Sequence, residues 1–286
     1  MGWFFWALLS AFSLATADVF TKKYLKAFSP WQMGAIRTFY AIPFLLPILF
    51  LPWPSLDKDF WFTLFLLYPL EILALILYMA ALKLSPLSLT LPFLSFTPVF
   101  LILTGWLILK ELPNLWGGVG ICLVVGGSYL LYLPRGFLNL KSVFTAFWRE
   151  KGSLLMLFVA LIYAITSALG KKAIIHSNPL FFGAFYYVGL GMFFLPSISK
   201  HPELRQKNVI PLGLILGFFI ALMIISHVIA ISQTKAVYMI SVKRLSPVFG
   251  VIYGGIILKE KHIPLRLFAT GCMCLGAIII YIWGLG

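Results

Sequence analysis

Apolar runs of about 20 residues recur along the whole chain, and short polar or basic stretches separate them. At 1.5 Å per residue, a helical run of this length crosses a hydrocarbon core of about 30 Å. Since lipid offers the backbone no hydrogen-bond partners, each run predicts a helix, and barrel strands would alternate instead. We therefore predict an all-α integral membrane protein with ten transmembrane helices. They are expected near residues 3–20, 34–51, 60–82, 88–109, 116–133, 153–169, 179–195, 209–231, 236–258 and 265–283.

The chain also repeats itself. A gapless shift of 149 residues, which places Lys22 on Lys171 (171 − 22 = 149), superposes one half on the other. The strongest matches are Pro98-Val99-Phe100 on Pro247-Val248-Phe249, Gly105 on Gly254, Glu111 on Glu260 and Gly127 on Gly276. The sequence thus predicts a first five-helix repeat over 1–133, a connecting loop over 134–152 and a second repeat over 153–286. Because five is odd, the second repeat enters the membrane inverted.

Inverted repeats are typical of transporters, in which the two halves move against one another around a site near the bilayer midplane. The fourth and fifth helices of each half also resemble the EamA-type domain of the drug/metabolite transporter superfamily. The motifs are those above together with Gly120 and Lys243-Arg244-Leu245-Ser246-Pro247. The resemblance implies a ten-helix metabolite exporter with a cavity between the halves and no cofactor.

Composition excludes other classes. Of the 286 residues, 62% are hydrophobic and 10% are charged, whereas a soluble domain carries roughly a quarter charged residues. The net charge of +14 lies mostly in short loops beside apolar helices, where it meets lipid headgroups, so we expect no nucleic-acid partner. The three cysteines lie inside apolar runs and imply no metal site. Most loop Lys and Arg lie in odd-numbered connections, which predicts termini outside the cytoplasm, whereas the family resemblance implies cytoplasmic termini.

Charges deep in the bilayer are the sharpest candidate site residues, because each costs about 2.5–3.5 kcal/mol without a partner or a wet cavity. Glu71 lies near the centre of the third helix, with Tyr68 and Tyr78 on the same helical face. Lys243 and Arg244 lie about eight residues into the ninth helix, at a depth from which a direct ion pair with Glu71 is feasible. In the other half these positions are apolar or neutral, so we predict a substrate or coupling site here, with a purely structural ion pair as the alternative.

Weaker candidates surround this group. His227 occupies the repeat position of Tyr78 and is either a ligand contact or a satisfied buried histidine. Tyr163 and Trp106 are further candidates for a cavity wall. We read Asp18, Lys22 and Arg37 as a structural charge cluster near the ends of the first two helices. Pro98 and Pro247 are expected to kink their helices, and Gly105, Gly254, Gly127 and Gly276 to allow close helix packing.

The leading interpretation is a secondary transporter, an exporter of small polar metabolites such as amino acids, in a prokaryotic plasma membrane. No phosphate-binding glycine-rich loop is present, so ATP is not the direct energy source. Export of cationic or apolar toxic compounds, or of anions recognised by Lys243 and Arg244, stays open. From other classes, a membrane-embedded enzyme using Glu71 and His227, or a scaffold, is the alternative. A monomer in the bilayer is compatible with the sequence.

Overall fold

The computed structural model describes residues 2–85, 87–131, 151–207, 209–249, 253 and 264–284. Within them every regular element is helical, so the predicted all-α class is confirmed. The first half contains α1 (Gly2–Tyr24), α2 (Pro30–Phe39), α3 (Ile42–Leu45), η1 (Leu46–Phe50), α4 (Lys58–Leu84), α5 (Leu87–Leu94), α6 (Thr97–Leu109) and α7 (Leu115–Leu131). The second contains α9 (Lys151–Ile175), α10 (Pro179–Phe193), α11 (Leu195–Lys200), η2 (Pro202–Arg205), α12 (Val209–Ser232), α13 (Ala236–Lys243) and α15 (Pro264–Trp283). The predicted connecting loop, up to residue 150, and Gly254 lie outside the described residues.

Six of the described helical segments are long and apolar enough to cross a membrane. They are Gly2–Tyr24, Pro30–Phe50, Lys58–Leu84, Lys151–Ile175, Pro179–Lys200 and Val209–Ser232. Shorter apolar helices, Thr97–Leu109, Leu115–Leu130 and Phe268–Trp283, stand beside them. Many large hydrophobic side chains, such as Phe65 at 73% exposure, point outward, as expected of a surface that faces lipid.

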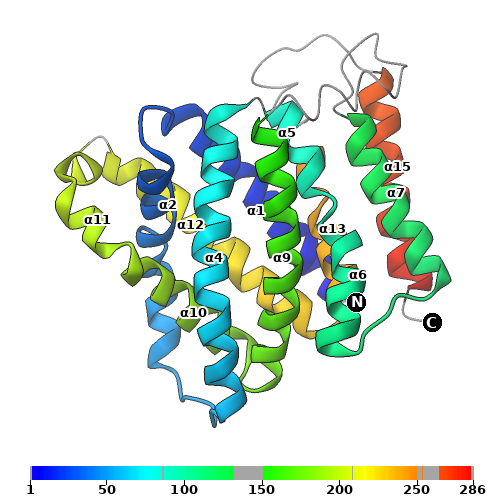
Figure 1. The fold of residues 1–286 in the computed structure, drawn as a ribbon, viewed down its shortest axis with the longest axis horizontal. Coiled ribbons are helices and arrows are strands. Elements are labelled where there is room, and N and C mark those ends of the chain that lie inside the picture. The colour runs from blue at the N-terminus through cyan, green and yellow to red at the C-terminus, as the bar shows by residue number, and fades with distance from the viewer. Residues whose placement is uncertain are drawn as a thin grey trace.

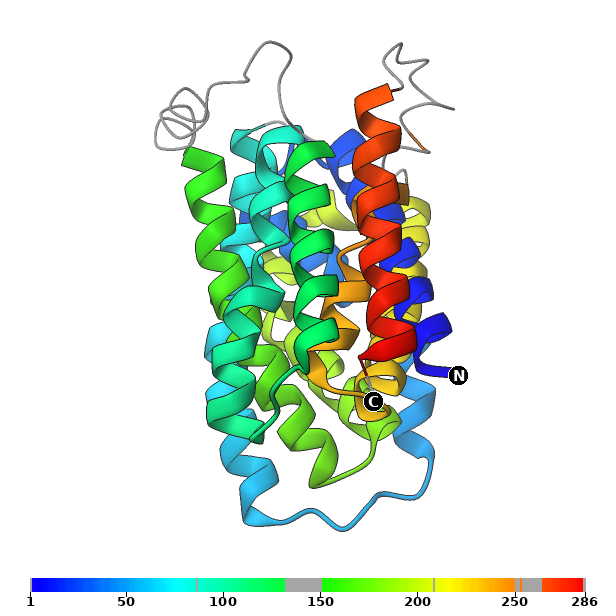
Figure 2. The ribbon, with the colours of Figure 1, turned by 90° about the vertical axis from the view of Figure 1, so that its right-hand side faces the viewer.

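The two halves run in opposite directions through the bundle (Figures 1 and 2). In Figure 2, α1 begins at the lower end and α9 at the upper end, and α7 and α15 likewise point in opposite directions. α1 begins and α15 ends at the same, lower end. This is the inverted arrangement that the odd number of helices per half predicted.

Helix starts follow the repeat. Ser29 caps α2, and Gln32 completes a capping box with it, while Asn178 caps α10 through its side chain. A proline follows each cap, at the position where a helix needs no N–H. Pro30 and Pro179, which are equivalent in the repeat, therefore begin the equivalent helix in each half.

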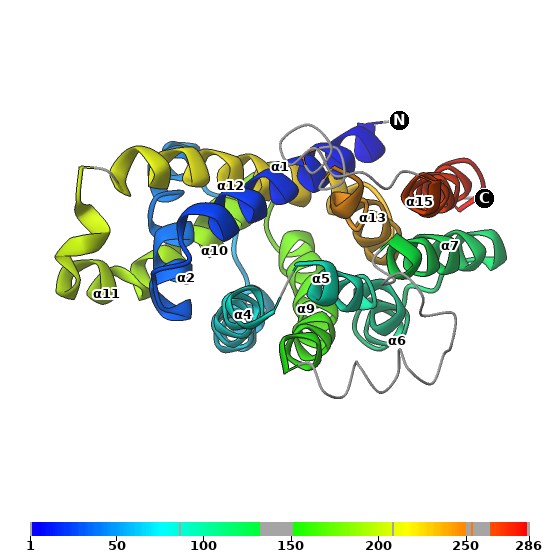
Figure 3. The ribbon, with the colours of Figure 1, turned by 90° about the horizontal axis from the view of Figure 1, so that it is seen from above.

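The halves interlock instead of standing apart. The most extensive helix pairs are α1 with α12, α4 with α9, and α7 with α15, and each pair joins one half to the other. Seen from above, α7 and α15 lie side by side at one end of the elongated bundle and α11 lies at the other (Figure 3). The core between them is therefore built jointly by both repeats.

Small residues let α7 and α15 approach closely. A methyl group added to Gly127 would lie 2.6 Å from Met273 and 2.8 Å from the carbonyl oxygen of Ala269. One added to Gly276 would lie 2.5 Å from the carbonyl oxygen of Gly120. These glycines fit the predicted role of close packing. Gly105 does not: the nearest atom to an added methyl is the Glu111 carbonyl oxygen at 3.6 Å, an ordinary contact.

Candidate functional site

Two transmembrane segments are broken at equivalent points. α5 ends at Leu94 and α6 begins at Thr97, and α13 ends at Lys243 before a turn of two residues and a helical stretch from 246 to 249. Each shared proline, Pro98 and Pro247, lies at the start of the segment that follows its break. The prediction of kinks is thus corrected to full interruptions, because proline lacks the N–H that would continue the preceding helix.

A cavity of about 130 Å³ lies between the halves, beside both breaks. Leu94, Lys243 and Arg244 reach it from the breaks themselves. Side chains of both halves complete its wall: Leu14, Arg37, Leu67, Glu71, Leu75, Tyr78, Tyr163, Thr166, Ser167, Gly170, Phe182, Gly183, Tyr186, Tyr187, Leu190, Met223, Ile224, His227, Val228 and Ile240. An apolar cavity of about 150 Å³ admits benzene, so this space is of the size of a small metabolite.

The structure brings most of the predicted site residues to this cavity. Glu71, Tyr78, His227, Lys243 and Arg244 all line it. Tyr68 is the exception among them. Its ring packs on Tyr186 with 5.4 Å between centroids, and its hydroxyl donates to the carbonyl oxygen of Phe185 at 3.4 Å. Tyr68 therefore stands behind the cavity wall.

Among the described residues, the buried cations of the ninth segment have only neutral partners within hydrogen-bond distance. Lys243 Nζ lies 3.0 Å from His227 Nδ1 and 3.2 Å from the sulfur of Met223. Arg244 Nη2 donates to Thr97 Oγ1 at 2.8 Å and so ties the two breaks together, while its Nε has no partner among the described residues. The described part of the chain contains no ion pair of Lys243 or Arg244 within 4 Å, so the direct pair with Glu71 is not formed in this conformation.

Glu71 is nevertheless close to the cationic side of the cavity. Its carboxylate lies beside the side chains of Thr166 and Tyr186, and it interacts electrostatically with Lys243. His227 hydrogen-bonds Lys243 through Nδ1, and the described residues show no hydrogen bond between Glu71 and His227.

The predicted charge cluster is formed only in part. Arg37 Nη1 pairs with Asp18 Oδ1 at 2.7 Å, and the hydroxyl of Tyr78 donates to Asp18 Oδ2 at 2.6 Å. Asp18 is 5% exposed and Arg37 is 4% exposed, so the pair is buried and neutralises itself beside the cavity. Lys22 is not a member, because its Nζ donates to the carbonyl oxygens of Leu82 and Ser85 instead.

Sequence reasoning missed the hydroxyl groups that α9 and α10 contribute to the wall: Thr166, Ser167, Tyr186 and Tyr187. The repeat contained the signal. Arg37 and Tyr186 occupy equivalent positions (186 − 37 = 149) and differ in chemistry, as Leu14 and Tyr163 do. Tyr163 lines the cavity as suggested, whereas Trp106 is 48% exposed and lies outside the cavity wall.

Equivalent lysines near the C-terminal ends of α1 and α9 form matching contacts. Lys22 Nζ donates to the carbonyl oxygen of Ser85 at 2.9 Å, and Lys171 Nζ donates to that of Thr234 at 2.6 Å, both 63 residues further on. Lys171 also pairs with Glu111, whose second carboxylate oxygen accepts from the first N–H of α13, that of Ala236, at 2.9 Å. Because α1 and α9 end at opposite ends of the bundle (Figure 2), these contacts lie at opposite ends of it.

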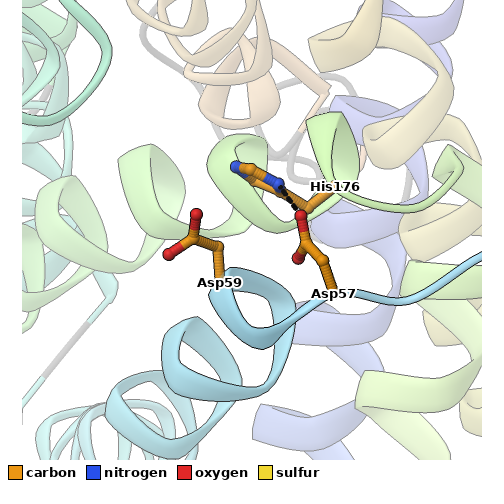
Figure 4. A group of neighbouring side chains, drawn as sticks. All are labelled: Asp57, Asp59 and His176. Carbon is orange, nitrogen blue, oxygen red and sulfur yellow. Dashed lines mark hydrogen bonds and ion pairs between the residues drawn. The ribbon is translucent and has the colours of Figure 1, made fainter.

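A second polar group lies outside the bundle, where the loop before α4 meets the end of α9 (Figure 4). The possible ligand atoms of Asp57, Asp59 and His176 lie within 4.8 Å of one another. Asp57 accepts from the N–H of Phe60 at 2.9 Å, which caps α4, and pairs with His176 at 2.6 Å. The Phe60 N–H and then His176 lower the pKa of Asp57 below its usual value. These exposed side chains therefore serve one another and the helix start.

Comparison with known proteins agrees with this architecture. The family model described as the EamA-like transporter family matches residues 1–133 and again 150–282. A protein of Archaeoglobus fulgidus described as an uncharacterized transporter is 26% identical over 280 residues, which covers 96% of this chain and 95% of that protein. A solved structure, described only as the crystal structure of a protein, has a TM-score of 0.74 and 14% identity, and covers 99% of this chain and 96% of its own. That structure shows the fold alone.

Proposed function

Since the chain belongs to the EamA-like transporter family, within the drug/metabolite transporter superfamily, we propose that it is a secondary transporter that exports small polar metabolites such as amino acids. The single observation that carries this proposal is the pair of broken helices beside a charged cavity between inverted halves. Broken helices at equivalent points of two repeats mark the substrate site of many transporters, because their free helix ends bind charged groups.

The cavity offers a zwitterion a partner for each of its charges. Arg244 has an Nε without a described partner, which suits a carboxylate, and Glu71 lies across the cavity wall to receive an ammonium group. Arg37 is already neutralised by Asp18, so the remaining charges are two cations and one anion. A cationic toxic compound would meet this excess of positive charge, which disfavours the main alternative.

Transport would proceed by alternating access. The contacts of Lys22 and Lys171 lie at opposite ends, so opening one end while the other stays closed exposes the cavity to one side of the membrane at a time. We further propose that the protein acts as a monomer in the plasma membrane of a prokaryote, without a cofactor, and that it catalyses no chemical reaction.

Transport into proteoliposomes tests this. The purified full chain is given sets of matched probes: an amino acid, its amide, which is a cation, and its deaminated acid, which is an anion. Leucine, leucinamide and 4-methylpentanoate form one such set. We expect the amino acid to move fastest. If none of the probes moves faster than in empty liposomes, the proposal is wrong, and movement of the amide alone or of the acid alone would favour the cationic or the anionic alternative.

A further inference from the structure

Lys243 is held in an unusual way for a buried lysine. Its side chain is 9% exposed, and its Nζ contacts only the imidazole nitrogen of His227 and the sulfur of Met223 at hydrogen-bond distance among the described residues. Neither partner is negatively charged. The proton that makes Lys243 a cation is therefore not held by an adjacent carboxylate.

Lys171 is the matched contrast within the same molecule. It is similarly buried, at 8% exposure, yet it pairs with the carboxylate of Glu111. Loss of its proton would leave the partly buried carboxylate of Glu111 without its counter-charge, which is costly. Loss of a proton from Lys243 leaves an amine that still hydrogen-bonds His227, because both an amine and an imidazole can donate or accept. The pair of Lys243 and His227 can thus exist with or without the extra proton and lose no hydrogen bond.

Charged side chains from several elements surround this pair. Arg244 on the same segment and Arg37 on α2 are cations, while Glu71 on α4 and Asp18 on α1 are anions. Asp18 already binds Arg37 and Tyr78. Glu71 is therefore the carboxylate whose interaction with Lys243 can change when substrate binds.

We propose that Lys243 and His227 form a proton-binding site, and that one proton carried by this pair is exchanged for each substrate molecule exported. The proposal rests on the proposed function. With the cavity open to one side, the Lys243 amine takes up a proton from water and becomes an ammonium. Open to the other side, it gives that proton back to water and becomes an amine. A substrate ammonium group and this proton bring the same charge to the same cavity near Glu71, so each disfavours the other, as exchange in opposite directions requires.

The first test needs no substrate. Nitrogen-15 NMR of lysine-labelled full-length protein in lipid nanodiscs distinguishes an ammonium from an amine, with Lys243 identified by the loss of its signal in Lys243→Arg. Between about pH 5 and pH 9, we expect the Lys243 signal to change from ammonium to amine. In His227→Leu, the ammonium loses its imidazole acceptor, and Lys243 should then change to an amine at a lower pH than in the wild type. An unchanging Lys243 ammonium in the wild type overturns the proposal.

The second test measures coupling. Proteoliposomes loaded with a pH-sensitive dye, with the membrane potential clamped, report proton movement when the fastest-moving amino acid of the probe sets is added. We expect amino-acid movement to drive protons the opposite way in the wild type, and Lys243→Arg, whose guanidinium keeps its proton, to lose this proton flux. Amino-acid transport without proton flux in the wild type overturns the exchange of protons and leaves the proposed function standing. Absence of transport for every probe overturns the proposed function itself.

Discussion

The first helix of each half carries a lysine near its C-terminal end, and the two lysines can be compared directly. Lys22 and Lys171 are equivalent in the repeat, and each donates to a carbonyl oxygen just beyond the third helix of its own half. The cavity walls, by contrast, carry different chemistry at equivalent positions: Glu71 against Ile220, Tyr78 against His227, and Lys243 against Leu94. Positions that hold helices together have stayed alike, and positions that face the cavity have diverged. A symmetric frame thus surrounds an asymmetric site.

The largest effect is expected where the halves differ most. Glu71→Gln keeps the size and some hydrogen bonding of the side chain and removes its charge, so we expect amino-acid transport to fall to the level of empty liposomes. Folding should survive, because glutamine is cheaper to bury than a carboxylate. Glu203→Gln is the matched control, since Glu203 binds Gln32 and His201 outside the cavity. Wild-type rates for Glu71→Gln at any pH between about 5 and 8 would show that Glu71 is only structural.

The next effect concerns the shared lysines. Lys171→Met leaves Glu111 unpaired and should lower the free energy of unfolding by about 2–4 kcal/mol, since breaking a buried ion pair exposes the remaining charge to an apolar surrounding. Lys22→Met removes the described contacts to two carbonyl oxygens and should cost about 1–3 kcal/mol. Thermal or denaturant unfolding in lipid-like detergent measures both. Adding Glu111→Gln to Lys171→Met should recover much of the loss, and failure to do so would contradict the assigned ion pair.

A smaller effect tests the contact of α7 with α15. Gly127→Ala should destabilise by about 1–3 kcal/mol, because the added methyl group overlaps Met273 and the Ala269 carbonyl. Its neighbour provides the control: no atom of the described residues lies within 4 Å of a methyl group added to Gly126. Gly126→Ala should be neutral or stabilise by up to about 1 kcal/mol through helix propensity. Equal unfolding midpoints for the two variants would show that the close approach is not needed.

The smallest effect is expected outside both regions. Asp57→Ala removes the cap of α4 and should lower the unfolding midpoint slightly, whereas Asp57→Asn keeps a capping side chain and should lower it less. Because the Phe60 N–H and then His176 lower the pKa of Asp57, its contribution to stability is present above the unfolded-state pKa near 4 and is lost as pH falls further. The difference in stability between wild type and Asp57→Ala should therefore shrink below about pH 4. A difference that does not depend on pH would contradict the role of the charge.

The helices and their inversion were predictable, because lipid forces each long apolar run to satisfy its own backbone and the gapless repeat fixes the odd count per half. Glu71, Lys243 and Arg244 were predictable because charge in a bilayer is costly and needs a cavity or a partner. The position of Tyr68 outside the cavity was not predictable. A shared helical face does not show how far the cavity extends along α4 before α10 packs against it. The partners of Lys22 were not predictable either, because they are backbone carbonyl oxygens, which every residue carries. Gly105 shows that a repeated glycine need not mark a close helix contact.

The interlocked pairing of helices has a consequence for how the chain is made. α1 finds its most extensive partner in α12, and α4 finds its own in α9, so the first repeat leaves the ribosome before either partner exists. During synthesis the helices of the first half enter the lipid before their partners are made, so their polar side chains lack the contacts of the final structure. The helices of the second half must then insert between them. Such long-range pairing is slow to form and leaves a vulnerable intermediate. It also implies that a chain cut between residues 131 and 151 should recover its structure only when both fragments are made together in one membrane.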